Sequence, residues 1–225
     1  MKKKLLVALT SAVASSLTAQ LVSARGHNLV MPASLKDIEY GLSQADALLI
    51  NLGMLDSRRL SLSRYAVRIA QKYRLPWVLD PVGAGGSVWR SAQANWFMEQ
   101  RPGIIKGNAA EIRALAGEIA KLRGMDSLDR SLDCLNAARK LNVRQVWVTG
   151  EWDLIFSKKA QWIEGGHVWM PRLVTLGCAL GALAALESTR LVALAHEVKQ
   201  AGAYAAQQSE GLGSFQSALV DAMTR

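Results

Sequence analysis

The stretch from Leu75 to Arg90 carries the residue types best suited to chemistry. It reads Leu-Pro-Trp-Val-Leu-Asp-Pro-Val-Gly-Ala-Gly-Gly-Ser-Val-Trp-Arg, an apolar run followed by Asp80, Pro81 and a glycine-rich loop. The apolar run is typical of a strand buried on both faces, and Pro81 ends it because proline cannot donate to a β ladder. The loop glycines allow positive φ or close approach of the backbone to a ligand. A carboxylate and such a loop after a parallel strand indicate a ligand site, although an ordinary strand-to-helix turn has the same composition.

Other predicted strands also end in polar residues. Asn51 follows one buried apolar run, Asn108 and Glu111 follow another, and Thr149 closes a third. The carboxyl ends of parallel strands meet along one edge of a sheet, so we expect these side chains to lie near Asp80. Asp80 and Glu111 would then hold Mg²⁺ directly or through water, since hard cations prefer oxygen ligands. Either acid could equally be a helix N-cap or a surface carboxylate.

A run of small residues beginning at Gly177 predicts a buried helix with a reactive group near its start. Cys178 follows Gly177, and the backbone N–H groups of a helix amino terminus stabilise a phosphoryl group or an alkoxide. The helix dipole would lower the pKa of the Cys178 thiol. The alternative is that Cys178 is a small buried apolar residue, the commoner role of a free cysteine.

Hydrophobic periodicity divides the chain into alternating strands and helices. It predicts strands at Ala47–Ile50, Trp77–Leu79, Gly103–Ile105 and Val143–Thr149, and a hairpin of Asp153–Phe156 with Ala160–Ile163. Helices are predicted at Leu5–Ala24, after a Ser34 cap, and at Ser57–Tyr73, Ser91–Gln100, Ala109–Leu115, Ser127–Leu141, Gly177–Glu187, Val192–Gln208 and Ser214–Met223. Strands that alternate with helices predict parallel βαβ units. No linker divides the chain, so residues 1–225 are predicted to form one three-layer α/β domain.

Composition excludes several classes of protein. Half of the residues are apolar, which excludes a disordered chain, and no apolar run reaches the ~20 residues of a membrane span. The net charge of +9 favours an anionic substrate over nucleic acid, because no basic-aromatic pattern is present. Cys134 and Cys178 fit no metal or redox spacing. Residues 1–24 have the outline of a secretory signal, but the predicted core of that signal contains several polar residues.

Several motifs together resemble the hydroxyethylthiazole kinase family. They are Asn51-Leu52-Gly53, Asp80-Pro81-Val82-Gly83-Ala84-Gly85, Gly107-Asn108-Ala109-Ala110-Glu111, Val148-Thr149-Gly150, Gly177-Cys178 and Gly211-Leu212-Gly213-Ser214-Phe215, in the family's order. The resemblance implies a ribokinase-like fold, a homotrimer with active sites between subunits, and a cytoplasmic protein. It also implies transfer of the γ-phosphoryl of ATP to the hydroxyethyl group of a thiazole, with Mg²⁺, in salvage for thiamine synthesis.

The resemblance also implies a role for individual residues. Met31 looks like the methionine of the thiazole pocket, with Asn51, Thr175 and Gly177 also on the substrate side. Asp80 and Glu111 look like the magnesium-site acids, and Cys178 like the presumed base for the alcohol. Asn108 and Thr149 look like nucleotide contacts, as does Lys106, which stands where the family has an arginine and lacks its bidentate fork.

A departure from the family pattern in the loop before Cys178 leaves two alternatives open. The family reads Thr-Gly-Thr-Gly-Cys where this chain has Val174-Thr175-Leu176-Gly177-Cys178. Thr175 replaces a glycine, and a β-branched residue is poorly suited to positive φ. One alternative is a kinase of the same fold for another small alcohol. Another is a homologue that binds nucleotide without catalysis.

Overall fold

The central sheet has eight strands in the order β10-β9-β8-β5-β4-β3-β1-β2. The computed structural model describes residues 2–119, 122–123, 126–127 and 129–224. Parallel pairing runs from β2 through β1, β3, β4 and β5 to β8, and the β9–β10 hairpin is antiparallel. The strands are β1 (Leu5–Leu9), β2 (Asn28–Val30), β3 (Ala47–Asn51), β4 (Trp77–Asp80), β5 (Ile104–Asn108), β8 (Gln145–Thr149), β9 (Asp153–Phe156) and β10 (Ala160–Ile163). The predicted, mostly parallel sheet is confirmed. A separate ladder pairs β6 (Leu122–Arg123) with β7 (Asp126–Ser127).

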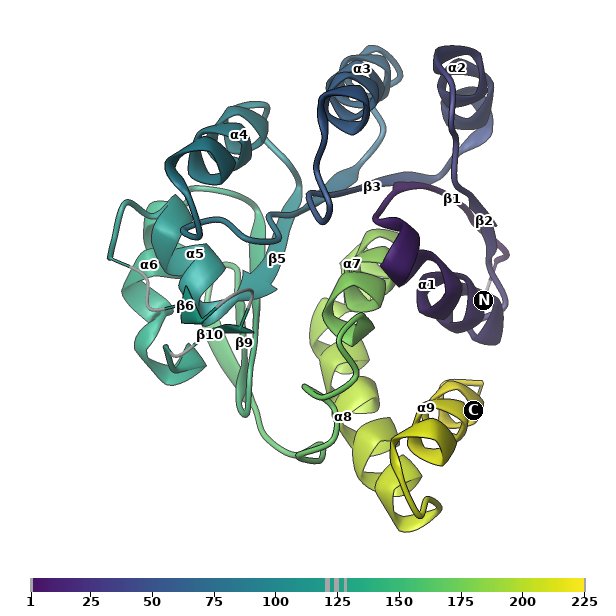
Figure 1. Ribbon diagram of the computed structural model, residues 1–225, viewed down its shortest axis with the longest axis vertical. Coiled ribbons are helices and arrows are strands. Elements are labelled where there is room, and N and C mark those ends of the chain that lie inside the picture. The colour runs from purple at the N-terminus through teal and green to yellow at the C-terminus, as the bar shows by residue number, and fades with distance from the viewer. Residues whose placement is uncertain (1, 120–121, 124–125, 128, 225) are drawn as a thin grey trace.

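Helices cover both faces of this sheet and complete three layers (Figure 1). One face carries α1 (Ala12–Ala24), α7 (Leu176–Leu186), α8 (Leu191–Gln207) and α9 (Leu212–Ala222). The other carries α2 (Leu35–Gln44), α3 (Ser57–Lys72), α4 (Val88–Glu99), α5 (Ala109–Leu115) and α6 (Leu135–Lys140). Strand residues alternate between the two cores: Leu6 packs with the first set and Val7 with the second.

The helix predicted over Leu5–Ala24 is wrong in its first part. Leu5–Leu9 is strand β1, paired between β2 and β3, and α1 begins only after Ser11, whose hydroxyl accepts a hydrogen bond from the Ala14 amide at 3.2 Å. A short apolar run fits a buried strand as well as a helix, and only its partners decide between them. Strand β2 was not predicted either, because its three residues are too few to show a period.

The remaining predicted elements are confirmed with small shifts, with one exception. The helix predicted over Ser127–Leu141 is shorter than expected. Ser127 ends β7, residue 128 lies outside the described residues, and a 3-10 turn (Ser131–Asp133) precedes α6. Another 3-10 turn (Ser188–Arg190) connects α7 to α8. Within the described chain, no single helix is long and apolar enough to cross a membrane, and only the α7–α8 pair, bent by 97°, meets the requirement by length and composition.

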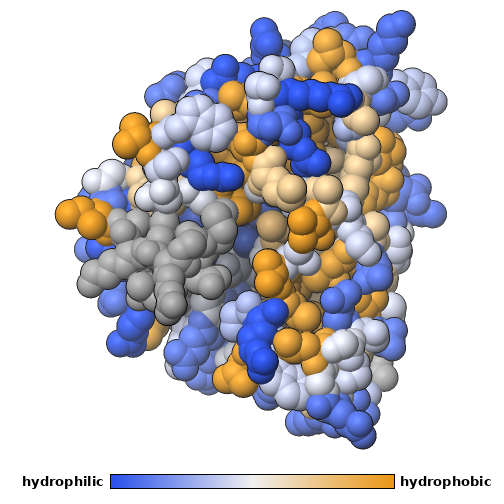
Figure 2. All heavy atoms as spheres, in the orientation of Figure 1, coloured by the Kyte–Doolittle hydropathy of each residue, from blue (hydrophilic) through white to orange (hydrophobic). Residues whose placement is uncertain are grey.

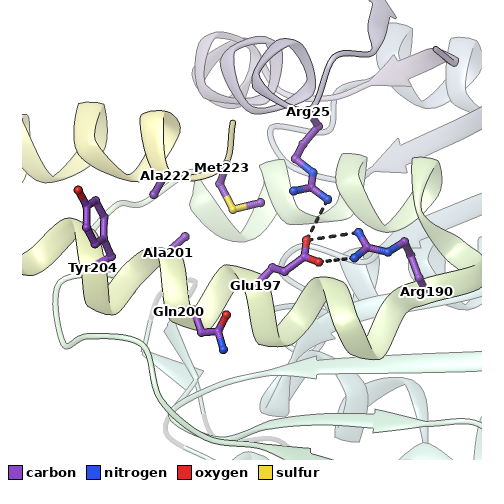
Figure 3. Close-up of a pocket in the computed structure, with 8 residues that line it drawn as sticks. All are labelled: Arg25, Arg190, Glu197, Gln200, Ala201, Tyr204, Ala222 and Met223. Atoms are coloured by element: carbon purple, nitrogen blue, oxygen red, sulfur yellow. Dashed lines mark hydrogen bonds and ion pairs between the residues drawn. The ribbon is translucent and has the colours of Figure 1, made fainter. Parts of the chain in front are cut away.

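Ion pairs join three helices at the carboxyl end of α7. Glu187 ends α7 and pairs with Arg25 of α1 at 2.9 Å and with Arg190 at 2.5 Å. Glu197 of α8 pairs with the same two arginines (Figure 3). The network borders a pocket of about 600 Å³ that Tyr204 and Met223 also line. These contacts fix α1 and α8 relative to the end of α7.

Candidate active site

Neighbouring strands bring their polar ends together, as the sequence predicts. In the sheet register, Asn51 at the end of β3 lies opposite Asp80 at the end of β4. The Asn51 amide donates to Asp80 Oδ2 at 2.7 Å, and both side chains are buried. On the next pair of strands, Asn108 of β5 lies opposite Thr149 of β8. The carboxyl edge of the sheet therefore holds four of the predicted site residues.

Asp80 forms a buried ion pair with Lys106. The Lys106 Nζ lies 3.6 Å from Asp80 Oδ1, and the two side chains are 4% and 1% exposed. Among the described residues, Oδ1 has no hydrogen-bond partner. Burial raises the pKa of Asp80, and the Lys106 charge only partly opposes this effect. Burial lowers the pKa of Lys106, but the charges of Asp80 and Glu111 outweigh it, so the pKa is raised and the ammonium stays charged.

Lys106 also lies against the start of α7. A β-carbon added to Gly177 would stand 3.3 Å from the Lys106 Nζ. At Gly181, one turn later, an added β-carbon would stand 3.5 Å from Asp80 Oδ2. The small residues at these positions thus allow the helix amino terminus to approach the charged pair. Contact of Lys106 with ATP remains a prediction.

Glu111 and Asn108 form a reciprocal cap at the start of α5. The Asn108 side chain accepts from the Glu111 N–H at 2.9 Å, and Glu111 Oε2 accepts from the Asn108 N–H at 2.8 Å. Glu111 Oε1 accepts from the N–H of Gly83 at 3.0 Å, which ties the glycine-rich loop to the cap. Burial, with the charge of Asp80, raises the pKa of Glu111 to about 7. The N-cap of α5 is thus Asn108, and Glu111 is the third helical residue of the capping box.

The glycine-rich loop adopts the backbone that its composition predicts. Gly83 and Gly85 have φ of 80° and 89°, a region that favours glycine. Arg90, at the start of α4, donates to the carbonyls of Leu52 at 3.1 Å and Val82 at 3.2 Å. The loops after β3 and β4 are therefore joined by one guanidinium. Arg90 belongs to the sequence motif, but a role as a tie between loops was not predicted.

The donor set fits Mg²⁺ held mainly through water. In the described part of the chain, no group of three or more His, Cys, Asp or Glu residues could hold a metal ion. Asp80 Oδ1 offers a buried oxygen that accepts no hydrogen bond from the described residues, whereas both oxygens of Glu111 already accept backbone N–H groups. Mg²⁺ typically keeps several waters and takes only one or two carboxylates. Asp80 would be the direct ligand and Glu111 would act through water.

Cys178 lies in the cluster, but its expected low pKa is wrong. Burial raises the pKa of the thiol to about 11, and the Asp80 charge adds to this effect. Lys106 and a hydrogen bond from the Asn51 amide act in the opposite direction without overcoming it. Burial, together with the charges of Asp80 and Glu111, thus outweighs the effect of the α7 amino terminus. At neutral pH the thiol is protonated in this structure.

Thr175 does not have the strained backbone that its substitution for glycine suggests. It precedes α7 with φ of −101°, which any residue adopts, and its side chain makes no cap hydrogen bond to the described residues. Thr175 and Gly177 are both half-buried.

In the space-filling view, apolar residues gather in the middle of the face over α1 and α7 (Figure 2).

Two predicted residues lie apart from the charged cluster. The Thr149 hydroxyl donates to the Gly107 carbonyl at 3.3 Å, and Thr149 ends β8, two strands from β4, which carries Asp80. Met31 follows β2, two strands beyond β3, and is half-buried. The structure therefore brings together Asn51, Asp80, Lys106, Glu111, Gly177 and Cys178, with Thr149 and Met31 on opposite sides of them.

Comparison with known proteins covers the whole chain. The hydroxyethylthiazole kinase family matches residues 1–225. The hydroxyethylthiazole kinase of Serratia proteamaculans is 40% identical over an alignment of 226 positions that covers 96% of this chain and 86% of that protein. That of Akkermansia muciniphila is 38% identical over 234 residues, covering 97% and 85% of the two chains.

Solved structures agree with this assignment. The structure of the hydroxyethylthiazole kinase from Pyrococcus horikoshii matches with a TM-score of 0.85 at 29% identity, over 99% of this chain and 88% of that one. A ribokinase-like superfamily protein from Enterococcus faecalis shares the fold, with a TM-score of 0.69 at 12% identity over 97% and 86% of the two chains. The predicted ribokinase-like fold is confirmed. The chain belongs to the hydroxyethylthiazole kinase family, because the family matches residues 1–225, curated relatives are about 40% identical, and the fold is shared.

Proposed function

We propose that this protein transfers the γ-phosphoryl group of ATP to the hydroxyl of 5-(2-hydroxyethyl)-4-methylthiazole, in salvage for thiamine synthesis. The family match over residues 1–225 carries the proposal. It is supported by the buried Asp80–Lys106 pair at the carboxyl edge of the sheet, next to the amino terminus of α7. Phosphoryl transfer needs chiefly positioning and positive charge, and both are available at this edge.

The residues divide between the two substrates. Asn108, Thr149 and Lys106 would contact ATP, while Met31, Asn51 and Thr175 would contact the thiazole. The Gly177 N–H and the Lys106 ammonium would face the oxygens of the moving phosphoryl group, because the helix amino terminus and the cation lie side by side. When bound at Asp80 and Glu111, Mg²⁺ would neutralise phosphate charge and the two carboxylates that raise the Cys178 pKa.

Cys178 is the proposed acceptor of the hydroxyl proton. As the substrate oxygen bonds to phosphorus, the bond between phosphorus and the ADP oxygen breaks and the hydroxyl proton leaves. Cys178 can accept that proton only in its thiolate form. Because the pKa of the thiol is raised, formation of the thiolate depends on neutralisation of the nearby carboxylates. A loose transition state leaves the hydroxyl proton in place until late in the reaction, which reduces the demand on the base.

The assembly and location follow the family resemblance. We propose that residues 1–225 act as one kinase domain within a cytoplasmic homotrimer, with its sites between subunits and with no nucleic acid or membrane partner. The apolar Val174, which adjoins Thr175 and is 87% exposed, supports burial of this edge by another subunit. Size-exclusion chromatography with light scattering measures the subunit number.

A second candidate is a kinase for another small alcohol. Thr175 and Leu176 replace residues of the family loop beside the phosphoryl path, while Asp80, Glu111 and Cys178 match the family. A changed loop before α7, together with these three retained residues, favours altered specificity over lost chemistry. The nucleotide-binding homologue without catalysis is the remaining alternative.

One assay distinguishes the three hypotheses: a hydroxyethylthiazole kinase, a kinase for another small alcohol, and a nucleotide-binding homologue without catalysis. Purified protein is supplied with ATP, Mg²⁺ and a panel of hydroxyalkyl heterocycles, and ADP release is measured. Hydroxyethylthiazole is expected to give the highest kcat/KM, and EDTA is expected to abolish turnover. Preference for another alcohol favours the second candidate. If the protein binds ATP but forms no ADP in the presence of any alcohol tested, the kinase proposal is contradicted.

The two cysteines provide a matched pair of variants for the same assay. Cys178→Ala is expected to lower kcat by roughly a hundred- to ten-thousand-fold with little change in ATP affinity, because positioned proton transfer is worth that much. Cys178→Asp should retain activity. Cys134 is buried between α5 and α6, where its thiol donates to the Ala109 carbonyl, so Cys134→Ala should leave kcat unchanged. Equal kcat for Cys178→Ala and Cys134→Ala would contradict the base assignment.

A further inference from the structure

A second buried ion pair lies outside the charged cluster. Lys199 of α8 places its Nζ 3.0 Å from Asp153 Oδ1, and the two side chains are 7% and 3% exposed. Neither residue belongs to a motif that the sequence analysis identified. The mechanism proposed above does not use them.

The ammonium group of Lys199 is fully engaged. Besides Asp153, it donates to the carbonyl of Gly150 at 2.7 Å and to that of Glu151 at 2.9 Å. An ammonium has three N–H groups, so each has one acceptor. Asp153 in turn accepts from the Gly150 N–H at 3.0 Å and from the Trp147 indole N–H at 2.8 Å. The pair therefore holds both backbone polar groups of Gly150.

Gly150 directly follows Thr149, the proposed nucleotide contact. The turn at Gly150 has little room to move, because an added β-carbon would stand 2.6 Å from the Ser131 hydroxyl oxygen. The position of Thr149 at the end of β8 is therefore set from one side by the β ladder and from the other by Lys199 and Asp153.

The aliphatic part of Lys199 contacts a second segment that leads to the site. Gly166 has φ of 85°, and a β-carbon there would stand 3.1 Å from Lys199 Cδ and 2.7 Å from the Met170 sulfur. This segment connects β10 to the turns before α7. The Lys199 side chain thus packs against the segment before α7 and also binds the turn after Thr149.

Such a pair is not explained by stability alone. Burial of two charges costs several kcal/mol per ion, and replacement of a buried pair by apolar residues is often neutral or stabilising. We propose that Lys199, through Asp153, is a positioning residue that holds Thr149 and the segment before α7 in the geometry that binds ATP. This inference rests on the proposed function.

The test compares Lys199→Met with Lys140→Met. Methionine keeps an unbranched apolar side chain that reaches as far as the lysine Cε, and it removes the ammonium group. Lys140 forms the exposed counterpart, an ion pair with Glu118 at 2.8 Å in which the lysine side chain is 58% exposed. The affinity for ATP is measured by calorimetry below the melting temperature of each variant, together with KM for ATP and for hydroxyethylthiazole.

Lys199→Met is expected to weaken ATP binding about tenfold or more and to raise KM for ATP, with KM for hydroxyethylthiazole within twofold of the unaltered protein. Lys140→Met should change neither. Asp153→Asn, which keeps a side chain of the same shape, should weaken ATP binding in the same direction and provides the test if Lys199→Met does not fold. If the folded variants have a lower melting temperature but an unchanged affinity for ATP, the inference is overturned and the proposed function is not affected. Absence of ATP binding by the unaltered protein overturns the proposed function and the inference together.

Discussion

The two ends of α7 each meet a group of charged side chains, about 16 Å apart along the helix axis. At the carboxyl end, Glu187 binds Arg25 and Arg190, and Glu197 binds the same two arginines (Figure 3). At the amino end, Asp80 faces Lys106 at 3.6 Å. Each group contains a buried acid and a buried base, Glu187 with Arg25 at one end and Asp80 with Lys106 at the other. They differ in how completely the charges are matched.

The pKa directions record this difference. Burial would raise the pKa of Glu187, but hydrogen bonds from Arg25 and Arg190 outweigh it, so the pKa is lowered. Asp80 and Glu111 have raised pKa values, because burial is not compensated by one lysine. An incompletely matched carboxylate is destabilising and is typical of a functional site, whereas a fully matched one stabilises the fold. The same kind of ion pair thus serves structure at one end of the helix and chemistry at the other.

The largest expected effect is on turnover at the amino end. Asp80→Asn removes the acid proposed as the direct metal ligand but keeps a side-chain oxygen for the Asn51 amide. Metal ions supply several kcal/mol of charge stabilisation in such reactions, so kcat should fall by roughly a thousandfold or more. Steady-state kinetics at saturating ATP and Mg²⁺ measures this loss.

The matched variant at the other end is Glu187→Gln, which also neutralises one buried acid. Its kcat should stay within about twofold of the unaltered protein, because Glu187 lies outside the proposed site. A comparable loss of kcat in both variants would show that the two ends of α7 do not differ in the way proposed here.

The next effect is on stability at the carboxyl end. Glu187→Gln leaves Arg25, which is 9% exposed, with Glu197 alone, and removal of one partner from a buried pair typically costs about 3–5 kcal/mol. We expect a loss of about 3 kcal/mol in the free energy of unfolding, measured by urea denaturation. Glu197→Gln changes the same network at a residue that is 34% exposed and should cost less than about 1 kcal/mol. Equal costs would contradict a dominant role for Glu187.

A third expectation is that stability depends on pH with opposite signs at the two ends. The folded pKa of Glu111 is about 7 against an ordinary 4.5, so its contribution is fully present below pH 4.5 and is lost as the pH rises to about 7. At ~1.4 kcal/mol for each pH unit, that loss is about 3 kcal/mol. The folded pKa of Glu187 is lowered, so its contribution is present above pH 4.5 and is lost as the pH falls below that value.

Denaturation in EDTA from about pH 2 to 8 measures both limbs of this profile. Glu111→Gln should flatten the decline between about pH 4.5 and 7, and Glu187→Gln should flatten the decline at acidic pH. If Glu111→Gln leaves the neutral limb unchanged, another group accounts for it. The pH scale thus reports which end of α7 carries the unmatched charge.

Prediction from sequence succeeded where turn residues bound an element closely. The helix over Ala109–Leu115 and the hairpin of Asp153–Phe156 with Ala160–Ile163 have the expected bounds, because polar or glycine residues flank them on both sides. The run Leu5–Leu9 gave no such signal, since a polar pair and then further apolar residues at helical spacing follow it. The register of β1 between β2 and β3 depends on residues distant in the chain.

The candidate site was predictable to a similar extent. Strand order and chemistry indicate that Asn51, Asp80 and Glu111 converge, and the register and hydrogen bonds confirm it, whereas the pairing of Lys106 with Asp80 was not predicted. Burial determines the Cys178 pKa, and burial by α7 and the neighbouring carboxylates cannot be read from a local motif. The pairing of Lys199 with Asp153 joins α8 to β9, two elements that the sequence separates widely, so no spacing rule indicates it.

The smallest expected effect concerns Thr175, at the amino end of α7. The observed φ of −101° requires no glycine, so Thr175→Gly relieves no strain and only increases the freedom of the unfolded chain. The unfolding free energy should fall by about 0.5–1 kcal/mol, with kcat within twofold. Gly83→Ala is the converse control, because φ of 80° disfavours alanine by about 1–2 kcal/mol. A rise in kcat of tenfold or more in Thr175→Gly would mean that residue 175 takes positive φ during turnover. The loop before α7 would then be rearranged by substrate, whereas we expect the geometry described here to be the one that reacts.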